Sequence, residues 1–273
     1  MPDTVAIIQG RMGSSRLPGK VLLDIGGKPM LQHVVERTRL AKTLDTVIVA
    51  TSSDPADDPI AAFCESNGVN CSRGSLHDVL DRYYQAAGGS SVVVRITADC
   101  PLIDPDLIDQ TVALVLNSSS AQRVDFAANR LPPPFHRTFP IGLDVEVCTF
   151  EALQRAWRES TETFHREHVM PFLYEGVTPQ SQTLQISTGK SPRGFNIAVL
   201  NHVPDYGSYR WTVDTPEDLI FVREIYSRLH GKGLRSFNWY DVLEILNKEP
   251  ELAQINAEIR HKTMTEVDER AKK

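Results

Sequence analysis

Short apolar runs alternate with amphipathic segments through the first 116 residues of the chain. Apolar runs that stop at glycine or polar residues predict buried strands, whereas apolar side chains spaced three and four apart predict helices. Because strand and helix alternate, we expect an α/β fold, with a doubly wound, mostly parallel sheet and helices on both faces. The strands are expected at residues 5–8, 47–51, 69–71 and 92–97, and the helices at residues 29–40, 59–66, 76–87 and 104–116.

The pattern is irregular between residues 117 and 139, where serine and proline runs interrupt it. We interpret residues from about 125 to 208 as an insertion that covers the sheet like a lid. It is expected to hold strands at 143–147, 182–187 and 195–200 and helices at 150–159 and 164–174. Residues 210–213 would return to the sheet, before a helix at 215–229. The main domain would span 1–230, and a helical extension would span 231–273 with helices at 238–246 and 251–269.

The composition is that of an ordinary globular protein, with 41% hydrophobic and 23% charged residues. The net charge of −6 over 273 residues argues against a nucleic-acid partner, because proteins that bind nucleic acids usually carry an excess of basic residues. No segment has the basic start and long apolar run of a signal peptide or a membrane span, so we expect a cytoplasmic protein without a membrane partner. No C-x-x-C pair is present, and we expect reduced thiols at Cys64, Cys71, Cys100 and Cys148.

The strongest chemical signal is the loop that follows the first predicted strand, at residues 10–20. Its glycines let the backbone approach a ligand closely, because glycine has no side chain to clash. Its cations place positive charge where the backbone amides converge, which favours a phosphate-rich ligand. The glycines are Gly10, Gly13 and Gly19, and the cations are Arg11, Arg16 and Lys20.

This loop differs from the two common phosphate-binding motifs. A P-loop needs four residues between its glycines and a hydroxyl after the lysine. Here five residues separate Gly13 from Gly19, and Val21 stands at the position of the hydroxyl. The G-x-G-x-x-G pattern of dinucleotide-binding loops is also absent from this loop.

The loop Gly10-Arg-Met-Gly-Ser-Ser-Arg-Leu-Pro-Gly-Lys20, followed by Gly26-Gly-Lys-Pro-Met30, resembles the signature of the sugar cytidylyltransferases. The resemblance is to the SpsF type of spore-coat polysaccharide synthesis, with the synthetases that activate Kdo and sialic acids as more distant relatives. It extends from about Val5 to about Leu229 and implies a nucleotide-diphospho-sugar transferase (GT-A-like) fold. It also implies catalytic roles for Arg11 and Lys20 and nucleotide contacts from Gln9, Gly10, Arg11, Met12, Gly13, Ser14, Arg16 and Lys20.

Two aspartates follow predicted strands at the edge where open α/β sheets bind ligands. Asp99 follows the strand at 92–97, and Asp214 follows the strand at 210–213. The alternative for Asp99 is an ordinary turn at the end of a strand. For the second motif the alternative is a helix start, in which Thr215 and Asp218 would cap the helix, but this gives no role to Asp214. The resemblance implies that both aspartates bind Mg²⁺, although Ala98 replaces the glycine that the family usually has before the first aspartate.

The segment from Cys71 to Tyr83 resembles the family's R-G-x-x-x-D-V-L-x-R-Y motif. The resemblance implies that Arg73 and Arg82 contact the nucleotide. The alternative for Arg82 is a solvated arginine on an amphipathic helix, and the sequence does not decide between them.

Two further motifs point to the second substrate. Asp144 and Glu146 lie in a segment that resembles the family's P-x-G-L-D-V-E-V, and strand alternation puts both acids on one face. Arg166 and His168 match R-E-H-V-x-P. The resemblance implies that these four residues bind the acceptor. A polar sheet face in water and a structural histidine are the alternatives.

We therefore expect a Mg²⁺-dependent cytidylyltransferase that uses CTP and an acidic or phosphorylated sugar-like acceptor and releases pyrophosphate. The resemblance implies a homodimer that acts in the synthesis of surface polysaccharide or glycoconjugate precursors. No Ser-His or Cys-His arrangement calls for a covalent intermediate. The alternatives are a nucleotidyltransferase that uses UTP or GTP, and a nucleotide-sugar-binding module like a glycosyltransferase domain.

Overall fold

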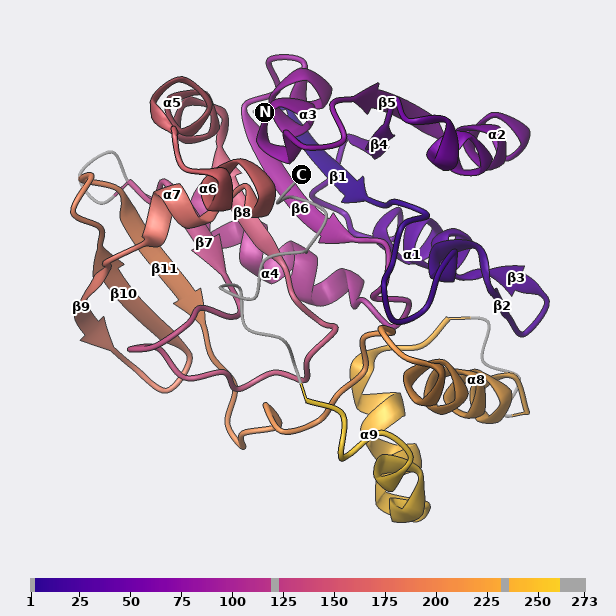
Figure 1. Cartoon of the computed structure of the whole chain (residues 1–273). Coiled ribbons are helices and arrows are strands. Elements are labelled where there is room, and N and C mark those ends of the chain that lie inside the picture. The colour runs from indigo at the N-terminus through magenta and orange to yellow at the C-terminus, as the bar shows by residue number, and fades with distance from the viewer. Residues whose placement is uncertain (1–2, 119–122, 232–235, 261–273) are drawn as a thin grey trace.

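The computed structural model describes residues 3–118, 123–231 and 236–260. Within these residues the chain forms a nine-stranded sheet in the order β5-β4-β1-β6-β8-β7-β11-β10-β9, beside a small β2–β3 hairpin (Figure 1). The strands from β5 to β6 are parallel, and β7 is parallel to β11. The remaining pairs are antiparallel, so the sheet is mixed.

The first half of the chain folds as its pattern predicts. Continuous apolar runs form the central parallel strands, and the segments with helical spacing form the helices that connect them. The strands are β1 (Thr4–Gln9), β4 (Thr46–Ser52), β5 (Asn70–Gly74) and β6 (Val92–Thr97), and the helices are α1 (Met30–Thr38), α2 (Asp58–Ser66), α3 (Val79–Ala87) and α4 (Pro105–Leu116). Between β1 and α1 lie the short elements η1 (Lys20–Leu22), β2 (Asp24–Ile25) and β3 (Lys28–Pro29), and η2 (Pro55–Asp57) precedes α2.

The second half extends the same sheet by five strands. These are β7 (Phe126–Ala128), β8 (Glu146–Thr149), β9 (Thr178–Gln182), β10 (Ile186–Lys190) and β11 (Asn196–Leu200). Its helices are α5 (Phe150–Glu159), α6 (Thr163–His168), α7 (Pro171–Tyr174), α8 (Pro216–Gly231) and α9 (Trp239–Lys248), followed by the 3-10 helix η4 (Pro250–Gln254). The segment predicted to cover the sheet thus also continues it sideways (Figure 1).

Four local predictions in this half were wrong. The strand predicted at 182–187 spans the turn of the β9–β10 hairpin, where Leu184 is 76% exposed. Residues 210–213 do not join the nine-stranded sheet and make a single bridge between Arg210 and Ile141. The helix predicted at 164–174 is divided into α6 and α7 by Val169, which has a φ of 71°. Beyond residue 250 the predicted α-helix is the 3-10 helix η4, and its part from 261 to 269 lies outside the described residues.

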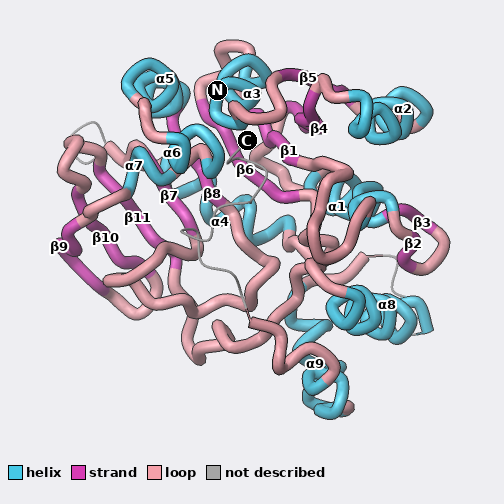
Figure 2. Tube along the Cα trace, in the orientation of Figure 1, coloured by secondary structure: helices cyan, strands magenta, loops and turns pink. Residues whose placement is uncertain are grey.

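Alternating side chains of the central strands feed two separate cores. Val5, Ile7 and Val93 pack with α3, α5 and α7 on one face, whereas Ala6 and Ile8 pack with α1, α2 and α4 on the other. Figure 2 shows these two helical layers on the two sides of the sheet. The doubly wound α/β architecture is therefore confirmed. A third core joins α8 and α9 to the edge of the sheet domain.

In the described part of the chain, no helix combines the length and the apolar character needed to span a membrane.

Candidate active site

Two aspartates from distant parts of the chain meet at the ammonium group of Lys20. Asp99 follows β6 at the carboxyl end of the parallel strands, and Asp214 lies just before α8. Lys20 Nζ donates hydrogen bonds to Asp99 Oδ2 at 2.6 Å and to Asp214 Oδ1 at 2.8 Å. The same nitrogen donates to the Val213 carbonyl oxygen at 2.8 Å. The two carboxylates thus converge on one positive charge, as a shared cation site requires.

Mutual charge compensation governs the electrostatics of this centre. Burial alone would raise the pKa of Asp214, but the Lys20 ammonium outweighs it and, with Arg16 and Arg210, holds that pKa below its usual range. Arg16 Nη2 lies 3.0 Å from Asp214 Oδ2, and Arg210 Nη2 lies 2.8 Å from the same oxygen. Burial would lower the pKa of Lys20, yet Asp99 and Asp214 raise it above its ordinary value. Lys20 and Asp214 are therefore both charged at neutral pH.

The glycine-rich loop carries Lys20 to this position. A Cβ built on Gly10 would lie 3.1 Å from the Ala98 Cβ, so the loop leaves β1 directly against the end of β6. Gly19 has a φ of 69°, a left-handed conformation that favours glycine. Its N–H donates to the Met12 carbonyl oxygen at 2.9 Å and closes the loop. This turn directs Lys20 back toward the strand ends instead of outward to solvent.

Arg82, which was predicted to contact the nucleotide, is a buried cation near this loop. It is 3% exposed and packs against Gly74, where an added Cβ would lie 2.8 Å from Arg82 Cγ. Burial lowers the pKa of Arg82, with Asp57 among the charges that oppose this effect. Across the described residues, its Nε and Nη1 atoms are buried and have no hydrogen-bond partner. Arg82 is not among the described residues that line the cavity beside Lys20, and a ligand would reach its two unused donors only if the covering side chains moved.

Two other arginines predicted at the site are held in ion pairs of their own. Arg73 Nη2 lies 2.7 Å from Asp58 Oδ1, and the Arg73 side chain reaches the start of α2. Arg166 Nε donates to Asp78 Oδ2 at 3.0 Å, which ties α6 to the start of α3. Neither arginine is among the described residues that line the cavity beside Lys20. The structure therefore does not bring Arg73 and Arg166 together with the Lys20 centre.

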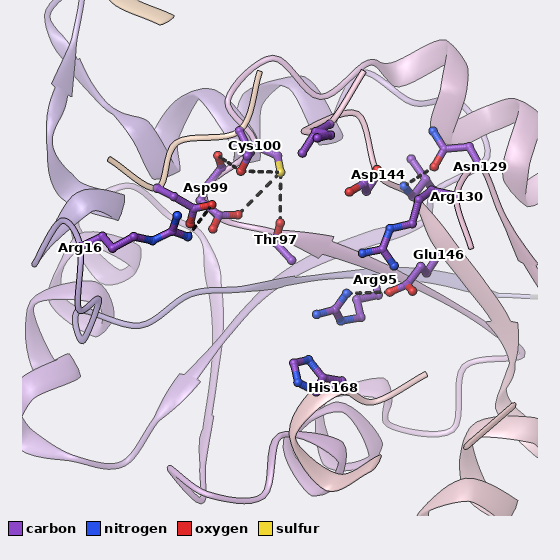
Figure 3. A pocket seen from close by; sticks show the side chains of 14 residues that line it. Arg16, Arg95, Thr97, Asp99, Cys100, Asn129, Arg130, Asp144, Glu146 and His168 are labelled. Carbon is purple, nitrogen blue, oxygen red and sulfur yellow. Dashed lines mark hydrogen bonds and ion pairs between the residues drawn. The ribbon is translucent and has the colours of Figure 1, made fainter. Parts of the chain in front are cut away.

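A cavity of about 280 Å³ opens beside this centre, at the carboxyl end of β6 and the beginning of β8. Figure 3 shows its two ends. Arg16, Asp99 and Cys100 lie at one end, and Arg130 and Asp144 lie at the other. His168 approaches from α6 and also lines the cavity.

The two acids predicted to contact an acceptor both line the cavity, and each is paired with an arginine. Arg95 Nη1 donates to Glu146 Oε2 at 2.6 Å (Figure 3). Arg137 donates through both Nη atoms to the two Asp144 oxygens, at 2.5 and 3.1 Å. Burial would lower the pKa of Arg95, but Glu146 raises it above its ordinary value. The cavity wall thus carries both signs of charge and suits a ligand with an anionic group and several hydroxyl groups.

Sequence-based prediction missed several cavity residues. Arg95 interrupts the apolar run of β6, and a charge inside a buried strand is a signal that could have identified it. Cys100 is buried in the cavity wall, and burial raises the pKa of its thiol, so its sulfur is protonated and unsuited to nucleophilic catalysis. No local signal marks the others, which are Thr97, Asn129, Arg130, Ile141, Val145 and Thr212.

The oxygen atoms around Lys20 suit a hard divalent cation. Mg²⁺ commonly takes one or two carboxylates and completes its shell with phosphate oxygens and water. Asp99 and Asp214 supply two carboxylates around a position that now holds a positive charge. Within residues 3–118, 123–231 and 236–260, this centre included, no group of three or more His, Cys, Asp or Glu side chains could hold a metal ion. A cation here would therefore need oxygens from a ligand.

A nucleotide-sugar-type α/β sheet with a cationic loop and two carboxylates, Asp99 and Asp214, at one cavity defines a nucleotidyltransferase architecture. A family model described as cytidylyltransferase matches residues 5–207, which is most of the chain. This chain belongs to the cytidylyltransferase family, whose members are nucleotidyltransferases, as the resemblance in the loop predicted.

Individual relatives agree with this assignment. The spore coat polysaccharide biosynthesis protein SpsF of Bacillus subtilis is 29% identical over 93% of this chain and 98% of its own length. The 3-deoxy-manno-octulosonate cytidylyltransferase of Geobacter sulfurreducens is 39% identical over 41% of this chain and 44% of its own length. Among solved structures, a cytidylyltransferase from Leptospira borgpetersenii has a TM-score of 0.80 and 31% identity, covering 96% of this chain and 100% of that one. A CMP:2-keto-3-deoxy-manno-octonic acid synthetase complexed with CTP shares the fold, with a TM-score of 0.58, 20% identity, and coverage of 83% and 99%.

Proposed function

We propose that this protein is a Mg²⁺-dependent cytidylyltransferase that transfers CMP from CTP to an acidic or phosphorylated sugar-like acceptor and releases pyrophosphate. The product would serve the assembly of a surface polysaccharide or glycoconjugate. The observation that carries this proposal is the meeting of Lys20 with Asp99 and Asp214, two residues that line the 280 Å³ cavity. Two relatives support it: one is named for spore coat polysaccharide biosynthesis, and the other was solved with CTP.

CTP would bind between the glycine-rich loop and the start of α3. The loop supplies backbone amides together with Arg11 and Arg16, whose charges suit a triphosphate. Arg82 offers two buried donors that lack a partner in the described structure. A nucleotide that accepts from these donors would recover the free energy that their burial costs, which favours binding at this place.

Asp99 and Asp214 would hold Mg²⁺ in the position that the Lys20 ammonium takes in the free protein. When bound, the cation would neutralise charge on the transferred phosphate and on the attacking oxygen. Lys20 would then leave the aspartates and donate to phosphate oxygens. Its ammonium would stabilise the charge that develops on pyrophosphate as it departs.

The acceptor would occupy the part of the cavity away from Lys20. Arg130 and His168 provide cationic or donor groups for an acidic function of the acceptor. Asp144 and Glu146, held in place by their arginine partners, would accept hydrogen bonds from hydroxyl or amino groups. Binding of both ends would orient one acceptor oxygen toward Asp99, where the transferred phosphate would lie.

The acceptor oxygen would attack the α-phosphorus of CTP and lose its proton to water. The bond between this phosphorus and the pyrophosphate oxygen would break in the same displacement. Because Cys100 is kept protonated by burial, the cavity offers no activated thiol for a covalent intermediate. Direct transfer therefore fits the described residues.

Release of pyrophosphate by the full chain tests the proposal directly. CTP, UTP and GTP would each be supplied with Mg²⁺ and a panel of sugar acids and sugar phosphates. We expect release with CTP that depends on both the cation and an acidic acceptor. Turnover of UTP or GTP in place of CTP would refute the cytidylyl assignment. Transfer from a ready-made CMP-sugar without pyrophosphate would instead identify a glycosyltransferase-like module.

We also propose that the chain acts as a homodimer. The edge strand β9 is exposed along its whole length, and Leu184 in the next turn is 76% exposed. An exposed edge with an apolar side chain favours pairing with another chain. Analytical ultracentrifugation at micromolar concentration tests this, and a monomer would refute it.

A further inference from the structure

The Oδ2 atom of Asp214 accepts a hydrogen bond from Arg210, which also forms a buried ion pair with Asp218. Arg210 Nη2 donates to Asp214 Oδ2 at 2.8 Å, while its Nε donates to Asp218 Oδ1, also at 2.8 Å. Arg210 is 6% exposed and Asp218 is fully buried. Arg210 and Arg16 both contact Oδ2 of Asp214, and Oδ1 accepts from Lys20.

Asp218 fixes the backbone of the same turn as well as the guanidinium. Its Oδ2 accepts from the N–H of Asp214 at 2.9 Å and from the N–H of Thr215 at 3.1 Å. The N–H of Asp218 in turn donates to Thr215 Oγ1 at 3.3 Å, which completes a reciprocal cap at the start of α8. One buried carboxylate thus sets both the backbone and the side-chain direction of Asp214.

A residue from the C-terminal segment completes this arrangement. Asn256 is 3% exposed, and its Nδ2 donates to the Arg210 carbonyl oxygen and to Asp218 Oδ1, both at 2.9 Å. Both partners are acceptors, so the position requires a group with two donors and no negative charge. A carboxamide nitrogen satisfies this requirement, whereas a carboxylate would repel Asp218.

Buried contacts hold the C-terminal segment against the rest of the protein and so fix the position of Asn256. Trp239 N donates to Asp104 Oδ2 at 2.8 Å, at the start of α4, and the Trp239 ring is buried in the third core. Arg37 Nη1 donates to the Phe237 carbonyl oxygen at 3.2 Å. The segment therefore contacts α1, α4 and the turn before α8, although the family model ends at residue 207.

We infer that the segment of residues 236–260 supports the active centre, and that its Asn256 is a positioning residue that holds Asp214 in place through Arg210 and Asp218. The inference rests on the proposed function, in which Asp214 helps to hold the divalent cation. Without Asn256, the Arg210 carbonyl loses a buried partner, and Asp218 loses one of the donors that fix its orientation. A displacement of about 1 Å at a reacting group can cost roughly a hundredfold in rate.

The test compares Asn256→Ala with Asn247→Ala in the full-length chain. Asn247 is an exposed residue of α9 and serves as a matched control. Mn²⁺ binding in the presence of CTP would be followed by water-proton relaxation enhancement, beside steady-state pyrophosphate release and the melting temperature. For Asn256→Ala we expect Mn²⁺ affinity to fall about tenfold, which is the effect of one lost hydrogen bond to a charged group. We expect kcat to fall with it and the KM for CTP to change little.

Mn²⁺ affinity and kcat equal to those of Asn247→Ala would overturn the inference, whatever happens to the melting temperature. Asn256→Ser keeps one donor and should give intermediate values, and it replaces the alanine variant in the same comparison if that variant does not fold. A wild-type protein that binds no Mn²⁺ with CTP would overturn the proposed function and this inference together. Wild-type binding with an unaffected Asn256 variant would overturn this inference and leave the proposed function standing.

Discussion

Replacing Lys20 by methionine would remove the charge between the two aspartates and keep an apolar stem of similar length. Its ammonium makes two charged hydrogen bonds, at 2.6 and 2.8 Å. Each such bond contributes about 1.5–3 kcal/mol, so a divalent cation that enters the free enzyme works against roughly 3 kcal/mol or more. Because about 1.4 kcal/mol corresponds to a factor of ten, we expect Lys20→Met to bind Mn²⁺ about a hundredfold more tightly than the wild type without nucleotide.

The same substitution should lower both stability and turnover. Breaking a buried ion pair from one side costs about 3–5 kcal/mol, and Lys20 is 8% exposed. Adding Mn²⁺ should restore much of this loss, since a ligand at about 100 times its Kd stabilises by roughly 2.7 kcal/mol. We expect kcat to fall by about 10²–10³, the usual cost of removing one donor to developing charge.

Electron paramagnetic resonance of free Mn²⁺ measures the affinity, and chemical unfolding with and without Mn²⁺ measures the rescue. Lys28→Met is the matched control, because Lys28 pairs with Glu36 on the surface, whereas Lys20 pairs with the two aspartates. The reasoning is refuted if Lys20→Met binds Mn²⁺ no more tightly than the wild type. Equal rescue of both lysine variants would refute it as well.

Three further predictions concern other residues, one of them with a matched control variant. Arg82→Met should weaken CTP binding at least about tenfold in calorimetry yet leave the melting temperature unchanged or higher, because it removes two buried donors without partners; a lower melting temperature would contradict this. Gly142→Ala should lower the free energy of unfolding in urea by at least about 2 kcal/mol, because the φ of Gly142 is 104° and the new Cβ would lie 2.4 Å from Thr212 N. Gly27→Ala is the control: Gly27 has a φ of 89° but no atom within 4 Å of an added Cβ, so its loss measures the backbone strain alone. The lowered pKa of Asp214 implies stability that is fully present above about pH 5, begins to be lost as the pH falls through about 4, where the carboxyl of the unfolded chain takes up a proton, and continues to be lost down to the lowered pKa of the folded state. Asp214→Asn should therefore lose less stability than the wild type between pH 5 and pH 3, and equal losses would count against the ion-pair account.

The sequence pattern predicted β1, β4 and β6 because each contains a continuous apolar run that ends at polar residues. For β5 it predicted residues 69–71, whereas the strand spans Asn70–Gly74 and its polar residues are exposed or half-buried at the edge of the sheet. It failed where tertiary contacts override local preference. Leu184 suggested a strand interior, but it occupies an exposed hairpin turn. Trp211 is buried in the third core without joining the sheet, because the bridge to Ile141 ends after Arg210. The spacing of apolar residues indicates which side chains are buried, but it does not show whether a strand or a helix packs against them.

Prediction of the site was similarly limited by what a local motif can contain. Asp99 could be identified because it follows a strand at the edge where open α/β sheets bind ligands. The strand predicted before Asp214 does not join the sheet, so Asp214 was identified by the resemblance of its motif to that of the family. Lys20 was expected to face phosphates from its loop, and its contact with both aspartates depends on the turn at Gly19. Asn256 could not be found, because 46 residues separate it from the carbonyl that it holds.

Charge balance explains why this centre is stable before any substrate binds. Three cations and three anions form one connected cluster: Arg16, Lys20, Arg210, Asp99, Asp214 and Asp218. A triphosphate that enters beside this cluster brings several negative charges, which Lys20 can help to neutralise if it leaves the aspartates. Its departure would leave two facing carboxylates without their shared counterion, at a cost of several kcal/mol, about the size of a broken buried pair. A divalent cation removes that cost, so the geometry favours entry of nucleotide and cation together over entry of either one first.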